Sequence, residues 1–447
     1  MNDIWGWTDP ASGREFAIVG RTDGTAFVEV TDPVNPVYLG SLPLHAGAQP
    51  SIWRDMKVYA NHAFIVADGA GAHGLQVFDL TRLLNVATPP VTFTEDAHYD
   101  AFGSAHNIVI NEDTGFAYAV GLSSGGTTCG GGFHAIDIRD PLQPTFAGCF
   151  ADYNTRRGYT HDAQCVVYHG PDAEHQGKEL CFGSNEDKVS IIDMTDKALP
   201  RVIANASYPN AAYTHQGWLT EDHRYLIVDD ELDELQGRTG GTRTLIWDVT
   251  DLDDPQLVSE YLAPRASIDH NQYVKGHYVF QAHYTSGLRI LDIADLDVPR
   301  EVAFFDTYTP GDGTSFQGAW SVYPYFPSGT IVVSSIGEGL FVLRSPLVAT
   351  GREALAEVPD THVLAEVYPN PFDGVITVTM QVADTQAVEV ALFDAAGRRV
   401  ATLHEGRLAS GLSHRFTFDG RTLAAGTYYV RIRGEHFTET RTLSRVR

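Results

Sequence analysis

Short apolar segments that contain an acidic residue recur along most of the chain. The first reads Phe27-Val28-Glu29-Val30 and runs into Thr31-Asp32-Pro33. Similar segments, spaced 44 to 58 residues apart, lie at 77–81, 135–141, 191–196, 246–251 and 290–295, with a degenerate copy at 341–345. Val and Ile favour strands, whereas Asp, Thr and Pro favour tight turns. We therefore expect the repeated acidic residue to cap a turn in each repeat.

Each repeat also has strand-like segments on either side of this motif. Residues 64–67 precede the second copy, for example, and residues 257–261 follow the fifth. Four short strands in a repeat of roughly 40 to 50 residues are typical of one blade of a β-propeller. The pattern predicts an all-β chain with a seven-bladed β-propeller over residues 1–345.

The last repeat is shorter than the others. It has strand-like segments at 321–323, 330–333 and 340–343, and no obvious fourth. We expect the missing outer strand of this blade upstream of residue 1. A signal peptide would have been removed with it, because the segment from Met1 to Trp5 has neither the basic nor the apolar part of such a peptide. The alternative is that residues 365–368 fill the place.

A different pattern begins after the last repeat. Residues 346–362 lose the strand pattern and are predicted to be a linker, and residues 363–447 then show short alternating strands with turns such as Ala396-Gly397-Arg398. About seven short strands in such a length are typical of a small β-sandwich. The sequence thus predicts a propeller followed by a small C-terminal β-sandwich.

Four stretches of the C-terminal segment carry a family resemblance: "YPNPF", "LFDAAGRRV", "SGLSHRFTFDG" and "LAAGTYYVRI". In them the segment resembles the type A sorting domain of the type IX secretion system, found in Bacteroidota and their relatives. The resemblance implies passage across the outer membrane by the type IX machinery, a partner of this segment. It also implies a mature protein that is extracellular or held at the outer cell surface.

Residues 1–345 resemble the choice-of-anchor B family, whose repeats are related to the LVIVD type. The matching stretches include "NDIWGWTDPASGREFAIVG", "WRDMKVYANHAFIV", "SAHNIVINEDTGFAYAVG" and "IDHNQYVKGHYVFQA". Members share the large domain and differ in the C-terminal anchor. The family implies a secreted or surface protein but supplies no reaction, so the chemistry must come from the residues.

Composition narrows the classes of partner. The formal net charge of −26 would repel nucleic acid and anionic membranes. No apolar run approaches the roughly 20 residues of a transmembrane helix. The sequence also lacks a P-loop, a GxSxG elbow and an HExxH helix, so no nucleotide cofactor and no familiar hydrolase are expected.

The four cysteines are Cys129, Cys149, Cys165 and Cys181, and none forms a CxxC pair. Cys165 and Cys181 flank a Gly-Pro turn, and Cys129 and Cys149 flank one strand-turn-strand unit. Neighbouring antiparallel strands would bring each pair within bridging distance. We expect the disulfides Cys129–Cys149 and Cys165–Cys181 and an oxidising compartment; four buried thiols are the alternative.

The candidate metal-binding or catalytic residues lie where the innermost strand of each repeat begins, close to the predicted axis. Aligning these positions gives pairs that start with a histidine in four consecutive repeats and continue with a polar residue in all of them. The pairs are Asn2-Asp3, Arg54-Asp55, His106-Asn107, His161-Asp162, His215-Gln216, His270-Asn271 and Trp320-Ser321. Neutral imidazoles suit a transition metal such as Zn or Cu, or acid–base work on a substrate. The structural alternative is that these histidines lock neighbouring blades together through backbone hydrogen bonds.

A second cluster, the acidic segment 229–234, follows the second strand of the fifth repeat and should share the face with His215. The equivalent loop of the sixth repeat holds His283. Carboxylates at this density suit Ca²⁺, with Asp230 and Glu231 as candidate ligands, although a solvated acidic loop is the simpler interpretation.

These features favour a protein that binds an unidentified extracellular ligand on this face. The candidate binding residues are Arg54, Asp55, Asn107, Asp162, Gln216, Asn271 and His283. The alternative is a metal-dependent extracellular enzyme. It would use His106, His161, His215 and His270 as metal ligands, with catalytic candidates His215, Asp230 and Glu231.

Overall fold

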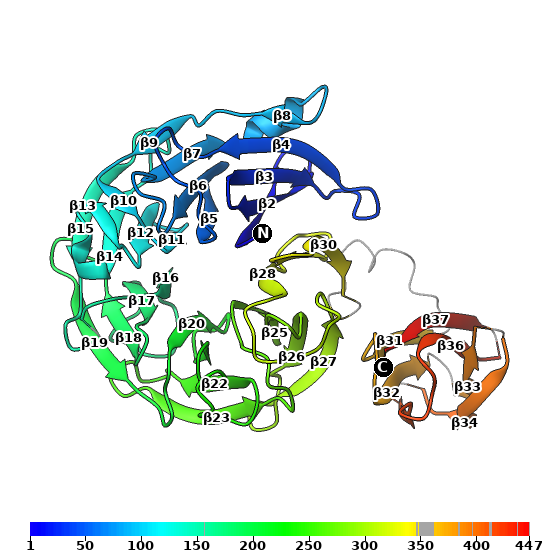
Figure 1. Ribbon diagram of the computed structural model, residues 1–447. Coiled ribbons are helices and arrows are strands. Elements are labelled where there is room, and N and C mark those ends of the chain that lie inside the picture. The colour runs from blue at the N-terminus through cyan, green and yellow to red at the C-terminus, as the bar shows by residue number, and fades with distance from the viewer. Residues whose placement is uncertain are drawn as a thin grey trace. The chain divides into compact units, whose positions relative to one another are not determined.

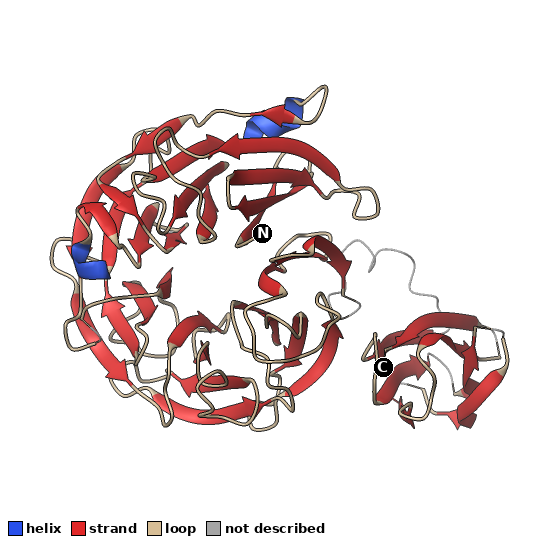
Figure 2. Cartoon of the chain, in the orientation of Figure 1, coloured by secondary structure: helices blue, strands red, loops and turns tan. Residues whose placement is uncertain are grey.

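The computed structural model describes residues 1–155, 157–345, 347, 362–382, 385–395, 397–410, 414–435 and 437–446. Strands dominate these residues, and the few helical turns are short (Figure 2). The chain divides into two compact units. The first comprises residues 1–300, 306–326 and 330–343, and the second comprises 301–305, 327–329 and 344–447. Of the predicted linker, 346–362, only residues 347 and 362 lie among the described residues.

Residues 1–344 form small antiparallel sheets whose strands follow one another in chain order. The first three sheets are β1 (Ile4–Thr8), β2 (Glu15–Arg21), β3 (Gly24–Glu29), β4 (Val37–Pro43) and, parallel to β4, β8 (Val91–Thr92); then β5 (Arg54–Tyr59), β6 (His62–Ala67), β7 (Leu75–Asp79) and β9 (Ala97–Tyr99); then β11 (Asn107–Asn111), β12 (Phe116–Val120), β14 (Phe133–Asp137) and β15 (Thr145–Phe150).

The next sheets are β16 (Asp162–Val167), β17 (Glu179–Ser184), β18 (Val189–Asp193) and β19 (Arg201–Ala206); β20 (Thr214–Leu219), β21 (Tyr225–Asp230), β22 (Arg243–Asp248) and β23 (Gln256–Leu262); β24 (Gln272–Lys275), β25 (Tyr278–Ala282), β26 (Leu288–Asp292) and β27 (Arg300–Phe305); and β28 (Ala319–Tyr323), β29 (Thr330–Ser335) and β30 (Gly339–Arg344). A pair of short strands, β10 (Phe102–Ser104) and β13 (Ser124–Gly126), and two 3₁₀ helices, η1 (Leu80–Asn85) and η2 (Cys129–Gly131), lie in connecting segments.

The sheets are arranged around a common centre (Figure 1). The first strand of each sheet faces this centre; these innermost strands are β1, β5, β11, β16, β20, β24 and β28. Each contacts the next around the centre, and β1 contacts both β5 and β28. The two ends of the unit therefore meet. The amino group of Met1 also donates a 2.7 Å hydrogen bond to the carbonyl of Ile336, in the turn between β29 and β30.

The apolar core lies between neighbouring sheets. Phe64 and Val77 of the second sheet pack with Ile108 and Ile136 of the third. Ile4 and Val19 of the first sheet pack with Val332 of the last in the same way. Strands buried on both faces need apolar side chains on both faces, which is why the strand runs read as continuous Val, Ile and Phe.

The repeated acidic residue does cap a turn. It ends the third strand of each of five sheets, where its carboxylate accepts a hydrogen bond from the backbone N–H two residues later. The residues are Asp79, Asp137, Asp193, Asp248 and Asp292. Such Asx turns depend on local geometry alone, and they explain why an acidic residue recurs at the end of the third strand.

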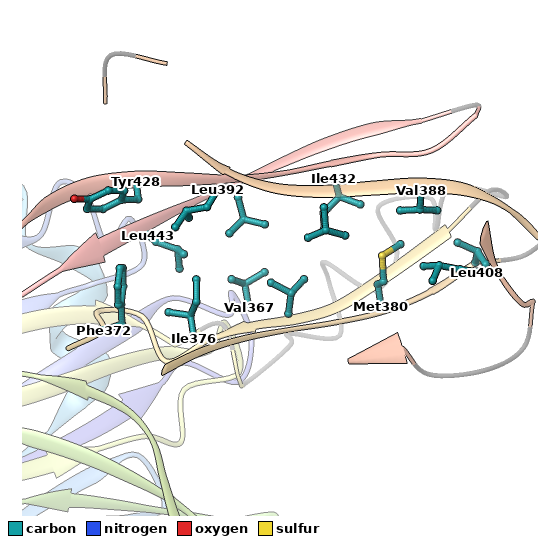
Figure 3. Close-up of a cluster of buried hydrophobic side chains, with 14 residues drawn as sticks. Val367, Phe372, Ile376, Met380, Val388, Leu392, Leu408, Tyr428, Ile432 and Leu443 are labelled. Atoms are coloured by element: carbon teal, nitrogen blue, oxygen red, sulfur yellow. The ribbon is translucent and has the colours of Figure 1, made fainter. Parts of the chain in front are cut away.

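The second unit consists of two sheets. One contains β31 (His362–Tyr368), β32 (Val375–Val382) and β35 (His414–Asp419). The other contains β34 (Arg399–Leu408), β33 (Gln386–Asp394), β36 (Gly426–Arg433) and β37 (Thr438–Arg445). Their buried side chains, among them Phe372, Ile376, Leu392 and Ile432, meet between the two sheets (Figure 3).

The pairing of β31 corrects one expectation. Residues 365–368 belong to β31 and pair with β32, so they do not complete the sheet of β28, β29 and β30. In the described residues that sheet has three strands, and an outer strand from upstream of residue 1 stays a prediction.

Candidate functional site

The four predicted histidines come together at the starts of consecutive innermost strands. His106, His161, His215 and His270 form a continuous row in which each ring centroid is 4.4 Å from the next. We call them the histidine row. They border a cavity of about 10 Å³, which we call the upper cavity, together with Asp3, Trp53, Arg54, Asn107, Asn271 and Trp320. A space of this size accommodates about one water molecule or one ion.

Backbone carbonyls of the next sheet orient two of these imidazoles. Nδ1 of His161 donates to the carbonyl of His215 at 3.1 Å, and Nδ1 of His270 donates to the carbonyl of Trp320. These bonds tie neighbouring sheets together, so His161 and His270 have the structural role that was the alternative to metal binding. They also fix the tautomer, since a proton on Nδ1 leaves the lone pair on Nε2, as in metal-binding histidines.

Glu231 completes a group with two members of the histidine row. One ligand atom each from His215, Glu231 and His270 lies within 4.8 Å of the others. Nε2 of His270 is 3.8 Å from Oε1 of Glu231, and the Tyr284 hydroxyl donates to that oxygen at 2.8 Å. The side chains of His215, His270 and Glu231 are 2%, 5% and 15% exposed, so the group is buried but reachable at Glu231.

Burial keeps these imidazoles neutral. Desolvation, the largest cause, lowers the pKa of His215 to about 4 despite the nearby charge of Glu231. Desolvation and then the neighbouring His215 lower the pKa of His161 and of His270 well below 6.5. Neutral imidazole is the form that binds metal. Nδ1 of His215 has no hydrogen-bond partner, although Oδ1 of Asp229 lies 3.4 Å away.

His106 and His161 lie in the row but outside the three-residue group. Nδ1 of His106 is 3.2 Å from Oδ2 of Asp68, whose other oxygen accepts a hydrogen bond from Ser123 at 2.6 Å. The structure thus brings two of the four predicted metal-binding histidines together with one predicted carboxylate.

The acidic segment is mostly buried rather than solvated. Asp229, Asp230 and Asp233 are fully buried, and Glu234 is nearly so. Both carboxylate oxygens of Asp230 are engaged, because they accept hydrogen bonds from the Tyr208 hydroxyl and from two backbone N–H groups, at 2.7 to 2.8 Å. Asp233 pairs with Arg243 at 2.7 Å. Asp230 therefore supports the loop, whereas Glu231 lies beside His270 and Asp229 beside His215.

Two of the other predicted binding residues hold the innermost strands together. Asp55 accepts a hydrogen bond from Lys57 at 2.7 Å and from the backbone N–H of Ile108 at 2.8 Å. Gln216 accepts one from the backbone N–H of Gln272 at 2.9 Å.

Arg54, the first residue of β5, is buried and contacts the first sheet. Its guanidinium donates to the carbonyl of Arg21 at 3.2 Å, and its Nη1 lies 2.7 Å from Nε2 of His73. His283 is buried but does not line the upper cavity.

A larger space of about 250 Å³ lies further along the innermost strands, and we call it the lower cavity. Trp5, Lys57, Trp218 and Tyr273 line it, with Asp162 and Gln216. None of the first four is among the site residues predicted from the sequence. Their signal was present, because each lies two positions after a polar residue of the alignment, and alternate residues of a strand point the same way.

Both predicted disulfides are confirmed. Cys165 and Cys181 are direct cross-strand partners in β16 and β17, with Cα atoms 4.1 Å apart, and Cys129 and Cys149 have Cα atoms 5.2 Å apart. Cys129 and Cys149 also lie close to His134. Their sulfurs are bonded to each other, however, so they are not thiolate ligands.

Comparison with known proteins identifies the C-terminal part. Residues 366–444 match the sequence profile of the secretion system C-terminal sorting domain. The segment is thus a sorting domain of the type IX system, and it indicates a secreted protein. No curated protein sequence matches the chain. In the part of the chain that the structure describes, no helix has both the length and the hydropathy of a membrane span.

Solved structures resemble the fold at low sequence identity. PorZ, described as an essential bacterial surface component of the type-IX secretion system of Porphyromonas gingivalis, matches with a TM-score of 0.52 and 14% identity, over 100% of this chain and 59% of that one. The β-propeller domain of Cps50 (Swd1) from Myceliophteria thermophila gives a TM-score of 0.48 at 11% identity, over 77% and 97% of the two chains. The WD40 β-propeller domain of Doa1 gives 0.48 at 10% identity, over 76% and 92%. The chain is all-β, with β-propellers among its structural neighbours.

Proposed function

We propose that the protein is a secreted or cell-surface binding protein that engages its ligand on the face of the histidine row, through a divalent transition metal held by His215, Glu231 and His270. In this proposal residues 1–345 form a seven-bladed β-propeller of the choice-of-anchor B type. Residues 363–447 form a β-sandwich that delivers the chain to the type IX machinery.

The convergence of His215, Glu231 and His270 carries this proposal. Two imidazole nitrogens and one carboxylate oxygen suit Zn²⁺, and also Cu, Fe or Ni. Ca²⁺ would need six to eight oxygen ligands. Asp230 is poorly suited as one of them, because both its carboxylate oxygens already accept hydrogen bonds. The acidic segment therefore supports a transition metal better than calcium.

Three protein ligands leave at least one coordination position for an outside group. The upper cavity is too small for an organic molecule, so a ligand would reach the metal with a single donor atom from the side where Glu231 is exposed. Nitrogen or oxygen donors, such as an imidazole or a carboxylate, are the matching chemistry.

A metal-dependent hydrolase is the second candidate. The observation in its favour is the same ligand set, because two histidines and a glutamate with an open position also occur in catalytic zinc sites. Such an enzyme needs a general base near the metal-bound water. The candidate Asp230 is not placed for this, since Tyr208 and two backbone N–H groups occupy its oxygens.

Elemental analysis of the purified full chain tests the metal site. After equilibration with Zn²⁺ and gel filtration, the chain should retain about one equivalent, and the double variant His215→Ala/His270→Ala should retain none. His277→Ala is the matched control, because His277 is exposed and lies in the turn after β24, whereas His270 precedes that strand. A wild-type chain that retains no zinc, copper, iron or nickel would overturn the metal site.

A further inference from the structure

The wall of the lower cavity combines aromatic rings with carboxyl groups. Three aromatic rings lie close together in its wall: Trp5 and Tyr273 have ring centroids 5.6 Å apart, and Trp218 and Tyr273 have centroids 4.8 Å apart. Asp162 and Gln216 lie at the starts of their strands, and Glu112 and Asp113 lie just beyond the end of β11. The cavity therefore has aromatic walls with carboxylates towards both ends.

Charges at the strand-start end do not balance. Asp3, Asp55 and Asp162 surround one cation, Lys57, whose Nζ is 2.7 Å from Oδ1 of Asp55. Asp3 accepts hydrogen bonds from the backbone N–H of Ile4 and from the Asn271 amide. Three carboxyl groups share one ammonium here, and burial raises the pKa of Asp162 to about 8, so its charged form lacks a compensating cation.

Asp162 is the carboxylate of this cluster that remains open. Its Oδ1 accepts a 2.7 Å hydrogen bond from the backbone N–H of Ala163, and its Oδ2 has no partner. The residue is half-buried and lines the cavity, and the absence of a partner for Oδ2 refers to the residues that the structure describes. A partly desolvated carboxylate is unfavourable in its charged form, and a cationic group placed against its second oxygen would stabilise that form.

The aromatic wall suits a cation as well. Nζ of Lys57 lies 4.6 Å from the centroid of Trp5, so the protein already places one ammonium over a ring of this cavity. Aromatic faces attract ammonium groups through their quadrupole, and they pack against the apolar stem of an alkylammonium. An anion would be repelled by the charged carboxylates, and a neutral polyol would not stabilise the charged form of Asp162, whereas an ammonium would.

We propose that the lower cavity is a binding site for an organic cation, a primary ammonium group on a short apolar stem, with Asp162 as its counter-ion and Trp5, Trp218 and Tyr273 packed around the stem. This site is independent of the proposed metal site, because it uses a different cavity and different side chains. The geometry directs the ammonium towards Asp162, and it places the stem towards the apolar side chains of Val109 and Val166.

Titration of the full chain with n-butylamine tests the site, with EDTA present so that the metal site plays no part. Trp5 and Trp218 line the cavity, so tryptophan fluorescence reports occupancy. We expect saturable binding of butylamine and none of n-butanol, which has the same stem without the charge. Asp162→Asn should weaken the binding at least tenfold, and the exposed control Asp100→Asn should leave it within twofold.

Trp218→Leu provides a second test that does not alter the charge cluster, and it should weaken butylamine binding several-fold. The melting temperature of each variant shows whether it is folded. Equal binding of butanol and butylamine, or unchanged butylamine binding in folded Asp162→Asn, would overturn the proposal. Binding of glucose or inorganic phosphate at the Asp162 site in place of butylamine would overturn it as well.

Discussion

Nε2 of His270 lies 3.8 Å from Oε1 of Glu231, although the two residues belong to neighbouring sheets. Glu231 directly follows β21, and His270 lies shortly before β24, so the contact crosses from one sheet to the next. The same carboxylate oxygen accepts a hydrogen bond from Tyr284, which follows β25. The proposed metal ligands are therefore held by contacts between sheets rather than by a local motif.

Tyr284 should act as a positioning residue for the metal. Tyr284→Phe removes the 2.8 Å hydrogen bond that orients Glu231 and leaves the aromatic ring in place. Loss of such an outer partner weakens metal binding by roughly 10- to 100-fold. Competition with a chromophoric chelator measures the Zn²⁺ affinity, and Tyr153→Phe, at an exposed position, is the control. Unchanged affinity in Tyr284→Phe would show that Glu231 is not held in this way.

Arg243 should be essential for the stability of the acidic segment. Its guanidinium pairs with the buried Asp233 at 2.7 Å and lies 3.8 Å from Asp230. Removing one partner of a buried pair costs about 3–5 kcal/mol, because the remaining charge is left uncompensated. Arg243→Met should therefore lower the free energy of unfolding by about this amount in urea denaturation.

A second substitution separates the charge effect from lost packing. Asp233→Asn in the Arg243→Met background removes the stranded carboxylate, so it should recover part of the lost stability. Arg201→Met, on the exposed strand β19, should change the stability little. If the double variant is no more stable than Arg243→Met alone, the guanidinium stabilises the loop by packing rather than by charge.

Asp162 should make stability fall as pH rises. Burial, the largest cause, raises its pKa to about 8, with Lys57 opposing and Asp55 and Asp3 adding to the shift. The folded state therefore binds a proton at this site between pH of about 4 and 8, where the unfolded chain has released it. Stability from this group is present at low pH and is lost as pH rises towards 8.

Asp162→Asn cannot ionise, so it escapes this loss. The melting temperature of Asp162→Asn minus that of the parent should increase as pH is raised from 5 to 8.5, measured without added amine. Comparing the difference removes the contributions of the histidines and of the other carboxylates. A difference that stays constant over this range would contradict a raised pKa for Asp162.

The sorting domain should be necessary and sufficient for the last step of export. Residues 366–444 match a secretion sorting domain. A chain that ends before residue 363 should stay inside an expressing cell that has a type IX system, and a soluble reporter that carries residues 363–447 behind a signal peptide should reach the medium or the surface. Immunoblots of cell fractions measure both. Export of the truncated chain would show that another segment carries the signal.

Much of the fold could be predicted from the sequence because its determinants are local. The carboxylates of Asp79 and Asp137 each cap a turn through the N–H two residues later, so the repeat could be read from spacing alone. Cys165 and Cys181 face each other across one hairpin, which made their pairing predictable. The alignment of the innermost strands likewise placed His161 and His215 in one row.

The partners of each side chain could not be predicted in the same way. Asp230 and Glu231 are adjacent in sequence, yet Asp230 turns to Tyr208 and Glu231 to Tyr284 and His270. Successive residues point in different directions, and which direction meets a hydrogen-bond donor depends on the neighbouring sheet. The lower cavity was also missed. Trp5, Lys57, Trp218 and Tyr273 each lie two positions after an aligned polar residue, but only the packing of their four strands shows that these side chains line one space.

The sequence by itself determined the repeated all-β architecture, the two disulfides and the sorting domain, because each depends on contacts within one turn or one hairpin, or on a motif that is continuous in the chain. It also determined the histidine row, because the repeats could be aligned at the starts of their innermost strands. Only the tertiary structure decided that His215 and His270 meet Glu231, that Asp230 is occupied inside its loop, and that Asp162 faces an aromatic cavity with an unpaired oxygen. These relationships arise where separate sheets pack around a common centre, and the distances there depend on how all the sheets fit together.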